Sequence, residues 1–199
     1  MAFLMTTGCR WLRLAAIRVF AACCAAVAIL PVASAEPPAQ AAIPAGYQLK
    51  AVFLFNFAQF VSWPPGAFQG AQSPIVIGVL GDDPFGSYLD RVVQGEKIGD
   101  RRLVVRRYSQ VEDVADCHIL FISRSEADHL GSVLARIKGR SLLTVGDLDN
   151  FARLGGMVRF VTENGKIRLR INVAAAKASG LTISSKLLAH ATIVATGTN

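Results

Sequence analysis

The sequence predicts an α/β fold: a mainly parallel, doubly wound sheet with a C-terminal β-hairpin and helices on both faces. Two observations lead to this prediction. Between residues 47 and 145, short apolar runs rich in β-branched residues alternate with stretches of helical spacing, which is the pattern of strand–helix–strand units. Between residues 157 and 171, two runs of alternating polarity flank Asn164 and Gly165, a strong hairpin signal because both residue types tolerate positive φ.

Residues 1–35 have the three parts of a cleavable secretory signal peptide. The basic part contains three arginines: Arg10, Arg13 and Arg18. Residues 19–30 are uncharged and apolar, and the Ala-Ser-Ala sequence that follows places the cut between Ala35 and Glu36. An uncleaved membrane anchor is the alternative, but the apolar segment is shorter than the ~20 residues that a spanning helix needs. A lipoprotein signal at Cys23 fits less well, because the apolar run continues past it.

The exported chain is predicted to form one domain. Residues 36–46 are rich in proline and alanine, which is typical of a flexible leader. Residues 47–196 are long enough to bury a substantial core. Loss of the three signal-peptide arginines lowers the formal net charge from +7 to +4, and export also argues against nucleic acid as a partner.

Cysteine and histidine usage predicts neither an internal disulfide nor a metal site. Cys117 is the only cysteine outside the signal peptide, and it precedes an apolar run, so we expect it to be a small buried side chain. His118, His129 and His190 lack the spacing of metal ligands. No cofactor is expected.

Residues 47–63 are predicted to form the central helix, which ends at the two prolines that follow. Apolar residues cover most of its circumference, so it should be buried on more than one side. One narrow stripe is polar and contains Gln48, Asn56, Gln59 and Ser62. Val52 and Phe55 project from within that stripe. Together with Trp63, they are candidates for contact with a partner.

Four apolar runs are predicted to be strands: residues 75–80, 103–105, 119–122 and 142–145. Helices are predicted at residues 85–94, 125–137, 172–179 and 186–194. The second strand lies in a cluster of arginines, which we interpret as a solvated strand edge that discourages aggregation. Binding of acidic lipid or of an acidic partner patch is the alternative.

The predicted hairpin places five apolar side chains toward the core: Val158, Phe160, Ile167, Leu169 and Ile171. Arg159, Arg168 and Arg170 alternate with them and are expected to face solvent. These arginines are the second candidate surface for binding a partner.

The chain also resembles the YfiR family of periplasmic regulators over about residues 47–194. The resemblance begins in the central helix with Leu49-Lys50-Ala51, Asn56-Phe57-Ala58 and Trp63-Pro64. It continues in four later stretches: Ile77-Gly78-Val79-Leu80-Gly81, Leu143-Thr144-Val145-Gly146-Asp147, Gly155-Gly156-Met157-Val158-Arg159-Phe160 and Ile183-Ser184-Ser185-Lys186-Leu187-Leu188. Each motif alone is weak, but the ordered set is specific.

The resemblance implies a Rossmann-like protein that forms homodimers in the periplasm. It implies repression of a membrane diguanylate cyclase through the cyclase's periplasmic region, with an OmpA-like outer-membrane lipoprotein that sequesters the repressor. The output would be the cyclic-di-GMP level, and so biofilm formation and motility. Relatives also occur beside other membrane sensors, so the partner does not follow automatically. The characterised type uses redox-responsive disulfides, which a chain with only Cys117 cannot form.

Two other functions are weighed against this one. A small-ligand-binding sensor would use the crevice at the carboxyl ends of the strands. Asp82, Asp83 and Asp147 all follow predicted strands, so they could meet there to bind a hard cation or to serve a hydrolase. For Asp147, which is followed by Asp149 and Asn150, turn and cap chemistry is the simpler interpretation. No G-x-S-x-G motif or catalytic triad is present. We therefore predict a non-catalytic regulator that acts by protein contact.

Overall fold

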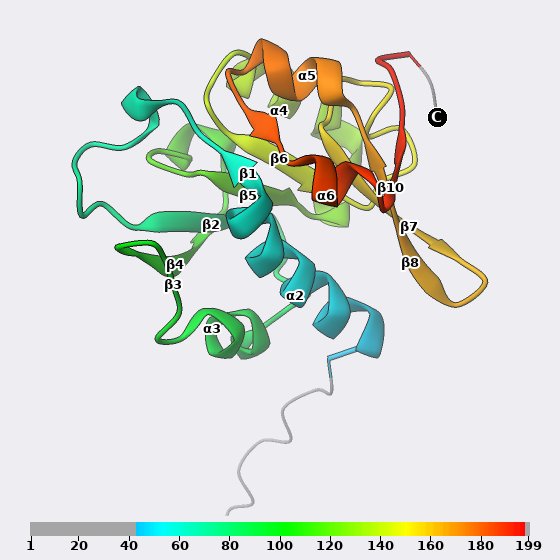
Figure 1. Ribbon diagram of the computed structural model, residues 1–199. Coiled ribbons are helices and arrows are strands. Elements are labelled where there is room, and N and C mark those ends of the chain that lie inside the picture. Colours follow the sequence, from blue (N-terminus) through cyan, green and yellow to red (C-terminus); the bar gives the residue numbers. More distant parts are fainter. Residues whose placement is uncertain (1–42, 198–199) are drawn as a thin grey trace, which may run out of the picture. The chain divides into compact units, whose positions relative to one another are not determined.

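The computed structural model describes residues 43–197 (Figure 1). The predicted signal peptide, residues 1–35, and most of the predicted leader, residues 36–46, lie outside the described residues. Within the described part, no helix combines the length and the apolar character that crossing a membrane requires.

An eight-stranded sheet lies at the centre, in the order β10-β8-β7-β6-β5-β2-β4-β3. Strands β4, β2, β5, β6 and β7 are parallel neighbours, whereas β8 runs antiparallel to β7 and β10 lies parallel to β8 at one edge. The predicted α/β fold with a C-terminal hairpin is confirmed. The strands are β2 (Ile75–Leu80), β3 (Lys97–Ile98), β4 (Arg101–Tyr108), β5 (Ile119–Ile122), β6 (Leu143–Gly146), β7 (Val158–Glu163), β8 (Lys166–Ile171) and β10 (Ala191–Ile193).

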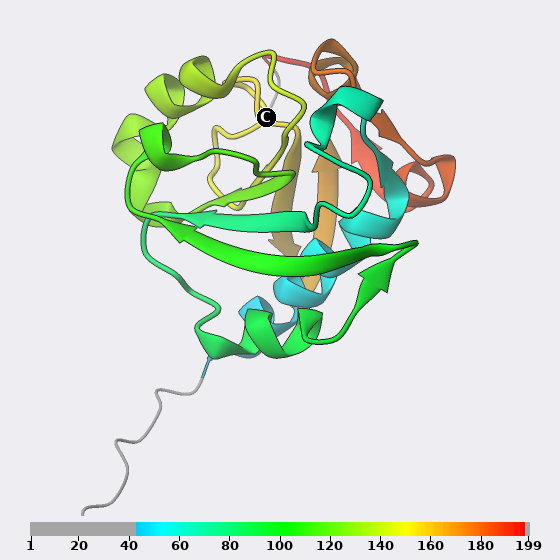
Figure 2. The same cartoon turned by 90° about the vertical axis from the view of Figure 1, so that its left-hand side faces the viewer.

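Helices pack on both faces of this sheet (Figure 2). The core on one face includes side chains of α2, α3, α5 and α6, and the core on the other face includes those of α4. The helices are α2 (Ala45–Phe60), α3 (Ser87–Val93), α4 (Leu130–Ile137), α5 (Val173–Ala178) and α6 (Ser185–Leu188), with 3₁₀ turns η1 (Pro65–Ala67), η2 (Val111–Asp113) and η3 (Arg124–His129).

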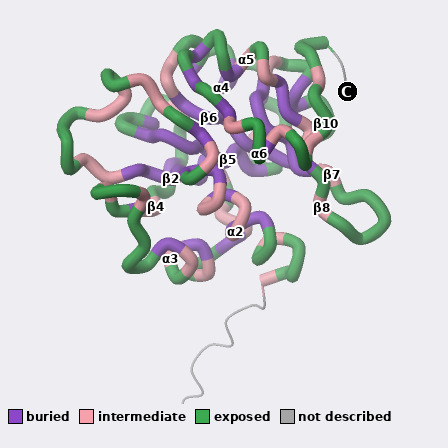
Figure 3. Tube along the Cα trace, in the orientation of Figure 1, coloured by how far each residue is buried: buried purple, intermediate pink, exposed green. Residues whose placement is uncertain are grey.

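Successive residues of the central strands β2, β5 and β6 are buried (Figure 3), and because side chains alternate along a strand, both faces are covered. In β5, Ile119 and Phe121 join the core beneath α2, whereas Leu120 and Ile122 join the core beneath α4. All four side chains are fully buried. A strand that must be apolar on both sides has no alternation in its sequence, and this is why these strands appear as continuous apolar runs.

The hairpin follows its predicted geometry. Glu163 pairs with Lys166, so the loop consists of two residues. Asn164 has φ of 51° and Gly165 has φ of 71°, the left-handed conformations that a tight hairpin turn requires. Figure 1 shows the β7–β8 hairpin extending beyond the rest of the sheet.

The central helix ends earlier than the sequence predicts. α2 stops at Phe60, and Val61 takes an extended conformation, with φ of −116° and ψ of 136°. Strand β1 (Val61–Ser62) then pairs antiparallel with β9 (Thr182–Ile183). The Ser184 N–H also donates to the Phe60 carbonyl at 2.8 Å. A partner more than a hundred residues away therefore decides where the helix ends.

The predicted helix at residues 186–194 is wrong in its second half. Only Ser185–Leu188 is helical, and Ala191–Ile193 form β10 beside β8. The β-branched residues Thr192 and Ile193 favour a strand, and the free edge of β8 supplies backbone hydrogen-bond partners.

Gly78 lies in β2 at a point of close contact with two other side chains. A Cβ atom there would come within 2.7 Å of the Cys117 Sγ and of the Tyr108 ring. We expect Gly78→Ala to lower the free energy of unfolding by about 1–3 kcal/mol, because the packed core must shift. Urea denaturation measures this change.

Gly131→Ala is the matched control for this prediction. Apart from its chain neighbours and the backbone of its own helix, no atom lies within 4 Å of a Cβ built at Gly131 in α4. The higher helix propensity of alanine should leave stability unchanged or raise it by up to about 1 kcal/mol. Equal effects at Gly78 and Gly131 would contradict the close packing around β2.

Candidate functional site

A buried ion pair lies at the carboxyl end of β6. Asp147 follows this strand with a side chain that is 2% exposed, and Lys50 reaches it from α2. The Lys50 Nζ lies 2.5 Å from the Asp147 Oδ2, and the Tyr47 hydroxyl donates to the same oxygen at 3.1 Å. The Lys50 ammonium also lies 4.1 Å from the centroid of the Tyr47 ring. These contacts attach the start of α2 to a central strand.

Arg124, just after β5, approaches Asp147 from another side. Its Nε lies 3.3 Å from the Asp147 Oδ1, although this oxygen has no partner with hydrogen-bond geometry. Burial raises the pKa of Asp147, but the hydrogen bond and charge of Lys50, with smaller contributions from Arg124 and Tyr47, outweigh burial and hold this pKa below its ordinary value. Asp147 is thus an ionised and neutralised carboxylate, which is unsuited to act as a general acid.

The sequence prediction missed Lys50, although a signal was present. Lys50 is the only charged residue between Tyr47 and Pro65. A lone charge in a helix that is buried on several sides needs an opposite charge nearby. A carboxylate at the end of a buried strand, such as Asp147, was the natural candidate.

Two of the three carboxylates considered for a metal or hydrolase site are engaged by separate cations, and the third, Asp82, is exposed. Asp147 pairs with Lys50, whereas the Asp83 Oδ2 lies 2.8 Å from the Arg107 Nε. The other oxygen of Asp83 accepts the Phe85 N–H at 2.7 Å, which is the hydrogen bond of an Asx turn. The side chain of Asp147, for which turn and cap chemistry was the predicted role, forms the buried ion pair instead. Among residues 43–197, no three His, Cys, Asp or Glu side chains are grouped so that they could hold a metal ion.

The crevice considered for a small ligand lies between β2 and β5, where the strand order reverses. Ser125 occupies it, and its Oγ accepts the Asp82 N–H at 2.9 Å. A Cβ on Gly81 would collide with this hydroxyl, and Gly81 has φ of 82°. The chain therefore closes this part of the crevice with its own side chain.

The outward side of α2 carries an apolar strip that consists of Leu49, Val52 and Phe55. Leu49 is 47% exposed, and the other two are half-buried. Phe55 also packs against the core beneath α2. On the inward side, Phe53 meets the Phe160 ring at a centroid distance of 5.8 Å. The two residues that the sequence predicted here, Val52 and Phe55, are thus partly exposed. Leu49 extends the strip and was not indicated by the sequence.

Trp63 lies outside this apolar strip and is half-buried. Its Nε1 donates to the His118 carbonyl at 3.2 Å. Its ring meets the rings of Phe68 and His118 edge-on, at centroid distances of 6.5 and 6.0 Å. The indole thus holds the segment that follows β1 against the sheet.

The three hairpin arginines share one face of the sheet, but they differ in exposure. Arg168 is exposed, and Arg170 is half-buried and lies 3.3 Å from Glu163. Arg159 is only 7% exposed, so the prediction that it faces solvent is wrong. Strand β6 pairs with β7 at this position, and Asp149 neutralises the Arg159 guanidinium. Alternation in a strand fixes the face of a side chain but not what covers it.

The hairpin arginines and the apolar strip lie on opposite faces of the sheet. Phe160 points to α2, and its neighbour Arg159 points the other way because successive side chains of a strand alternate. Arg170 lies directly opposite Arg159. A single flat partner surface therefore cannot cover both candidate sites.

His118 is a buried titratable group beneath the segment that follows β1. It is 3% exposed, and its ring stacks on Phe68 at 4.4 Å. The Val76 N–H donates to the His118 Nδ1 at 3.2 Å, so the neutral ring carries its proton on Nε2, which has no hydrogen-bond partner. Burial is the main reason why the pKa of His118 lies below its ordinary value; Arg101 lowers it further, while the Ala67 carbonyl and Asp116 act in the opposite direction.

Residues 47–192 match the protein family described as YfiR/HmsC-like. The matched region begins in α2 and ends within β10, so it spans the whole sheet apart from the last residue of that edge strand. No curated protein sequence matches the chain.

Lys50→Met tests the buried ion pair. The variant leaves the Asp147 carboxylate buried without its main partner, so we expect the free energy of unfolding to fall by about 3–5 kcal/mol. The Arg124 side chain is 67% exposed, so the control Arg124→Met should cost at most about 1 kcal/mol. Losses of similar size in the two variants would show that the buried pair does not fix α2.

His118→Asn tests the buried imidazole, since the asparagine oxygen can still accept the Val76 N–H. The pKa of His118 is lowered in the folded state, so the unfolded state binds more protons just below pH ~6.5. The part of the free energy of unfolding that depends on neutral His118 should be fully present above that pH, and it should fall as the pH drops toward the folded-state pKa. Denaturation at pH 7 and pH 5 should show a smaller loss for His118→Asn than for the native chain. The control His129→Asn, at an exposed position, should lose as much stability between pH 7 and pH 5 as the native chain. If His118→Asn also loses as much as the native chain, His118 is not the source of the loss.

Proposed function

The chain belongs to the YfiR/HmsC-like family, and on that basis we propose that it is a non-catalytic periplasmic regulator that binds the periplasmic part of a membrane sensor. Regulation of diguanylate cyclases from the periplasm is the activity of this family. The proposed sensor is accordingly a diguanylate cyclase that the bound regulator represses. Repression lowers cyclic-di-GMP and so controls biofilm formation and motility. The family match carries this proposal.

The proposed mechanism is differential affinity. The regulator binds the inactive state of the sensor more tightly than the active state, and this difference shifts the equilibrium toward inactivity. An OmpA-like outer-membrane lipoprotein would relieve repression by competing for the regulator. The signal peptide would direct export and be cleaved between Ala35 and Glu36, and the exported chain would act as a homodimer.

Several side chains that could take part in catalysis are paired or buried, and this supports a role without catalysis. Asp83 and Asp147 are each paired with a cation. His118 is buried beneath aromatic rings, and Cys117 is buried with its pKa raised to about 12. A thiol with so high a pKa is a poor nucleophile at neutral pH.

The proposed contact surface is the apolar strip of Leu49, Val52 and Phe55. Partly exposed apolar side chains on one side of a helix are suited to the desolvated centre of a protein interface. Arg168 and Arg170 lie on the other face and would form a separate contact with an acidic segment. Arg159 is buried and Trp63 is engaged in the fold, so neither belongs to the proposed contact surface.

Leu49→Glu and Val52→Glu test the apolar strip. Each places a charge at the centre of the proposed interface, so we expect affinity for the cyclase's periplasmic domain to fall at least about tenfold. Both positions have solvent access, so the thermal midpoint should stay close to that of the native chain. The control Gln110→Glu adds the same charge at an exposed position beside η2, whose residues pack against the core beneath α4 rather than the core beneath α2, and should bind normally. Normal binding by both strip variants would place the interface elsewhere.

The function itself is tested by cellular cyclic-di-GMP in three strains: intact, lacking this chain, and carrying a copy without residues 1–35. We expect the level to rise on deletion, and we expect the unexported copy not to restore it. An unchanged level after deletion would refute repression of a cyclase. Restoration by the unexported copy would refute action in the periplasm.

A further inference from the structure

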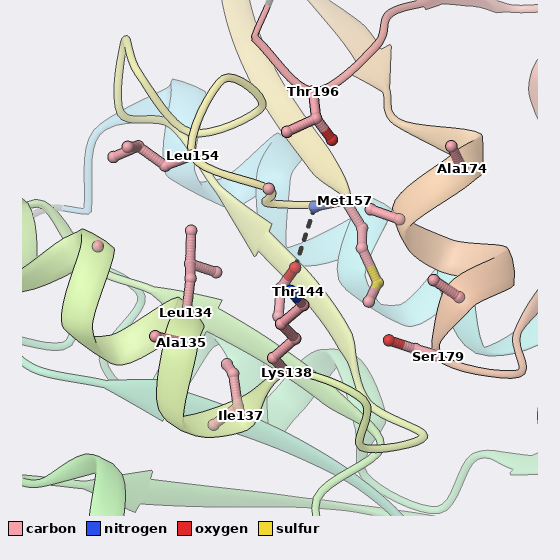
Figure 4. Close-up of a pocket in the computed structure, with 14 residues that line it drawn as sticks. Leu134, Ala135, Ile137, Lys138, Thr144, Leu154, Met157, Ala174, Ser179 and Thr196 are labelled. Atoms are coloured by element: carbon pink, nitrogen blue, oxygen red, sulfur yellow. Dashed lines mark hydrogen bonds between the residues drawn. The ribbon is translucent and has the colours of Figure 1, made fainter.

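A cavity of about 460 Å³ lies between α4 and α5 (Figure 4). This α4–α5 cavity is distinct from both candidate partner surfaces, because its lining residues come from neither α2 nor the hairpin strands. It exists because β7 pairs with β6 only at Val145 and Gly146, so the first half of β6 has no neighbour on that side. Small residues on the two helices leave the space unfilled: Gly131, Ala135, Ala174 and Ala178.

The walls of the α4–α5 cavity are mainly apolar. Leu134, Ile137 and Met157 line it and are otherwise buried in the protein. Leu154 lines it too but is 43% exposed, so a large apolar side chain remains in contact with water there. The volume lies within the range of about 300–1,000 Å³ that is usual for small-molecule sites. The apolar part of a bound ligand would cover the Leu154 side chain and the other apolar walls and so remove them from contact with water.

Two polar groups of the cavity have no partner within residues 43–197. The Ser179 side chain points into the cavity, the residue is only 7% exposed, and its hydroxyl makes no hydrogen bond. The Lys138 ammonium forms no ion pair. In contrast, the Thr144 hydroxyl already accepts the Met157 N–H, and the Thr196 hydroxyl already accepts from Asn172. Within the described residues, Ser179 and Lys138 are thus the two polar side chains of the lining that make no hydrogen bond or ion pair, whereas the Thr144 and Thr196 hydroxyls accept one hydrogen bond each and keep a proton to donate.

We propose that the α4–α5 cavity binds an unbranched aliphatic monocarboxylate. The chain lies between α4 and α5 against Leu134 and Met157, and the carboxylate meets the Lys138 ammonium and the Ser179 hydroxyl. Lys138 follows the last turn of α4, whose carbonyls carry a partial negative charge of about half a unit. The full positive charge of Lys138 exceeds that partial charge, so an anionic head group is favoured there. This ligand site goes beyond the proposed regulation of a sensor.

Calorimetric titration of the purified protein with hexanoate, octanoate and decanoate tests this site. Each added CH₂ that enters an apolar site should tighten binding by about fourfold, until the cavity is filled. Decanol and decylamine keep the chain but lack the carboxylate, so we expect both to bind at least about tenfold more weakly than decanoate. Equal binding of the amine or the alcohol would refute the assignment of the head group.

Variants locate the binding site. Ala178→Leu fills the space between the helices, and Lys138→Met removes the charge while it keeps the length of the side chain. Each should weaken decanoate binding at least about tenfold. Ala127→Leu and Lys166→Met are the matched controls at exposed positions outside the cavity, and they should bind decanoate as the native chain does.

Folding of each variant is checked by its thermal midpoint without ligand. If Ala178→Leu does not fold, Lys138→Met still decides the question, because its side chain is exposed. Absence of carboxylate binding to the native chain would refute the proposal, as would binding that neither variant weakens. Loss of cyclase binding in Ala178→Leu, with no carboxylate binding by the native chain, would identify the cavity as a partner contact and would equally refute a ligand site.

Discussion

The position of the central helix depends on the buried pair of Lys50 and Asp147. Neither charge is stable alone in a site so poorly accessible to water, so each residue requires the other. Tyr47 covers the ammonium with its ring and donates to the carboxylate, and Arg124 adds a second positive charge. Together with the contact of Phe53 and Phe160 further along α2, the pair fixes the helix to the sheet at two points. The rotation of α2 about its axis is then determined.

That rotation decides which side chains reach solvent. α2 is apolar around most of its circumference, so the hydrophobic effect alone favours several orientations almost equally. Only one orientation brings Lys50 to Asp147, and it leaves Leu49, Val52 and Phe55 on the outward side. The proposed contact surface is therefore a consequence of the same ion pair that holds the helix. This buried ion pair at the carboxyl end of β6 gives specificity of arrangement where apolar packing is ambiguous.

The apolar strip and the α4–α5 cavity are different kinds of site. The face under α2 carries the apolar strip, which is suited to a protein partner. The cavity between α4 and α5 has the size and lining of a small-molecule site. A partner on α2 and a ligand in the cavity would not compete for the same residues. Coupling between the two sites would pass through the core that α2 and α5 share on one face of the sheet, and it would be reciprocal.

The sequence by itself determined the parts of the fold that depend on local chemistry. β2 and β5 need apolar side chains on both faces, and the hairpin turn needs residues that accept positive φ, so both were predictable. Tertiary structure alone decided the end of α2, the strand β10 and the burial of Arg159, because each depends on pairing with another strand, which the local sequence does not specify. The same holds for Lys50, whose partner is 97 residues away. A sequence shows that a charge must be neutralised, but only the folded chain shows which residue neutralises it.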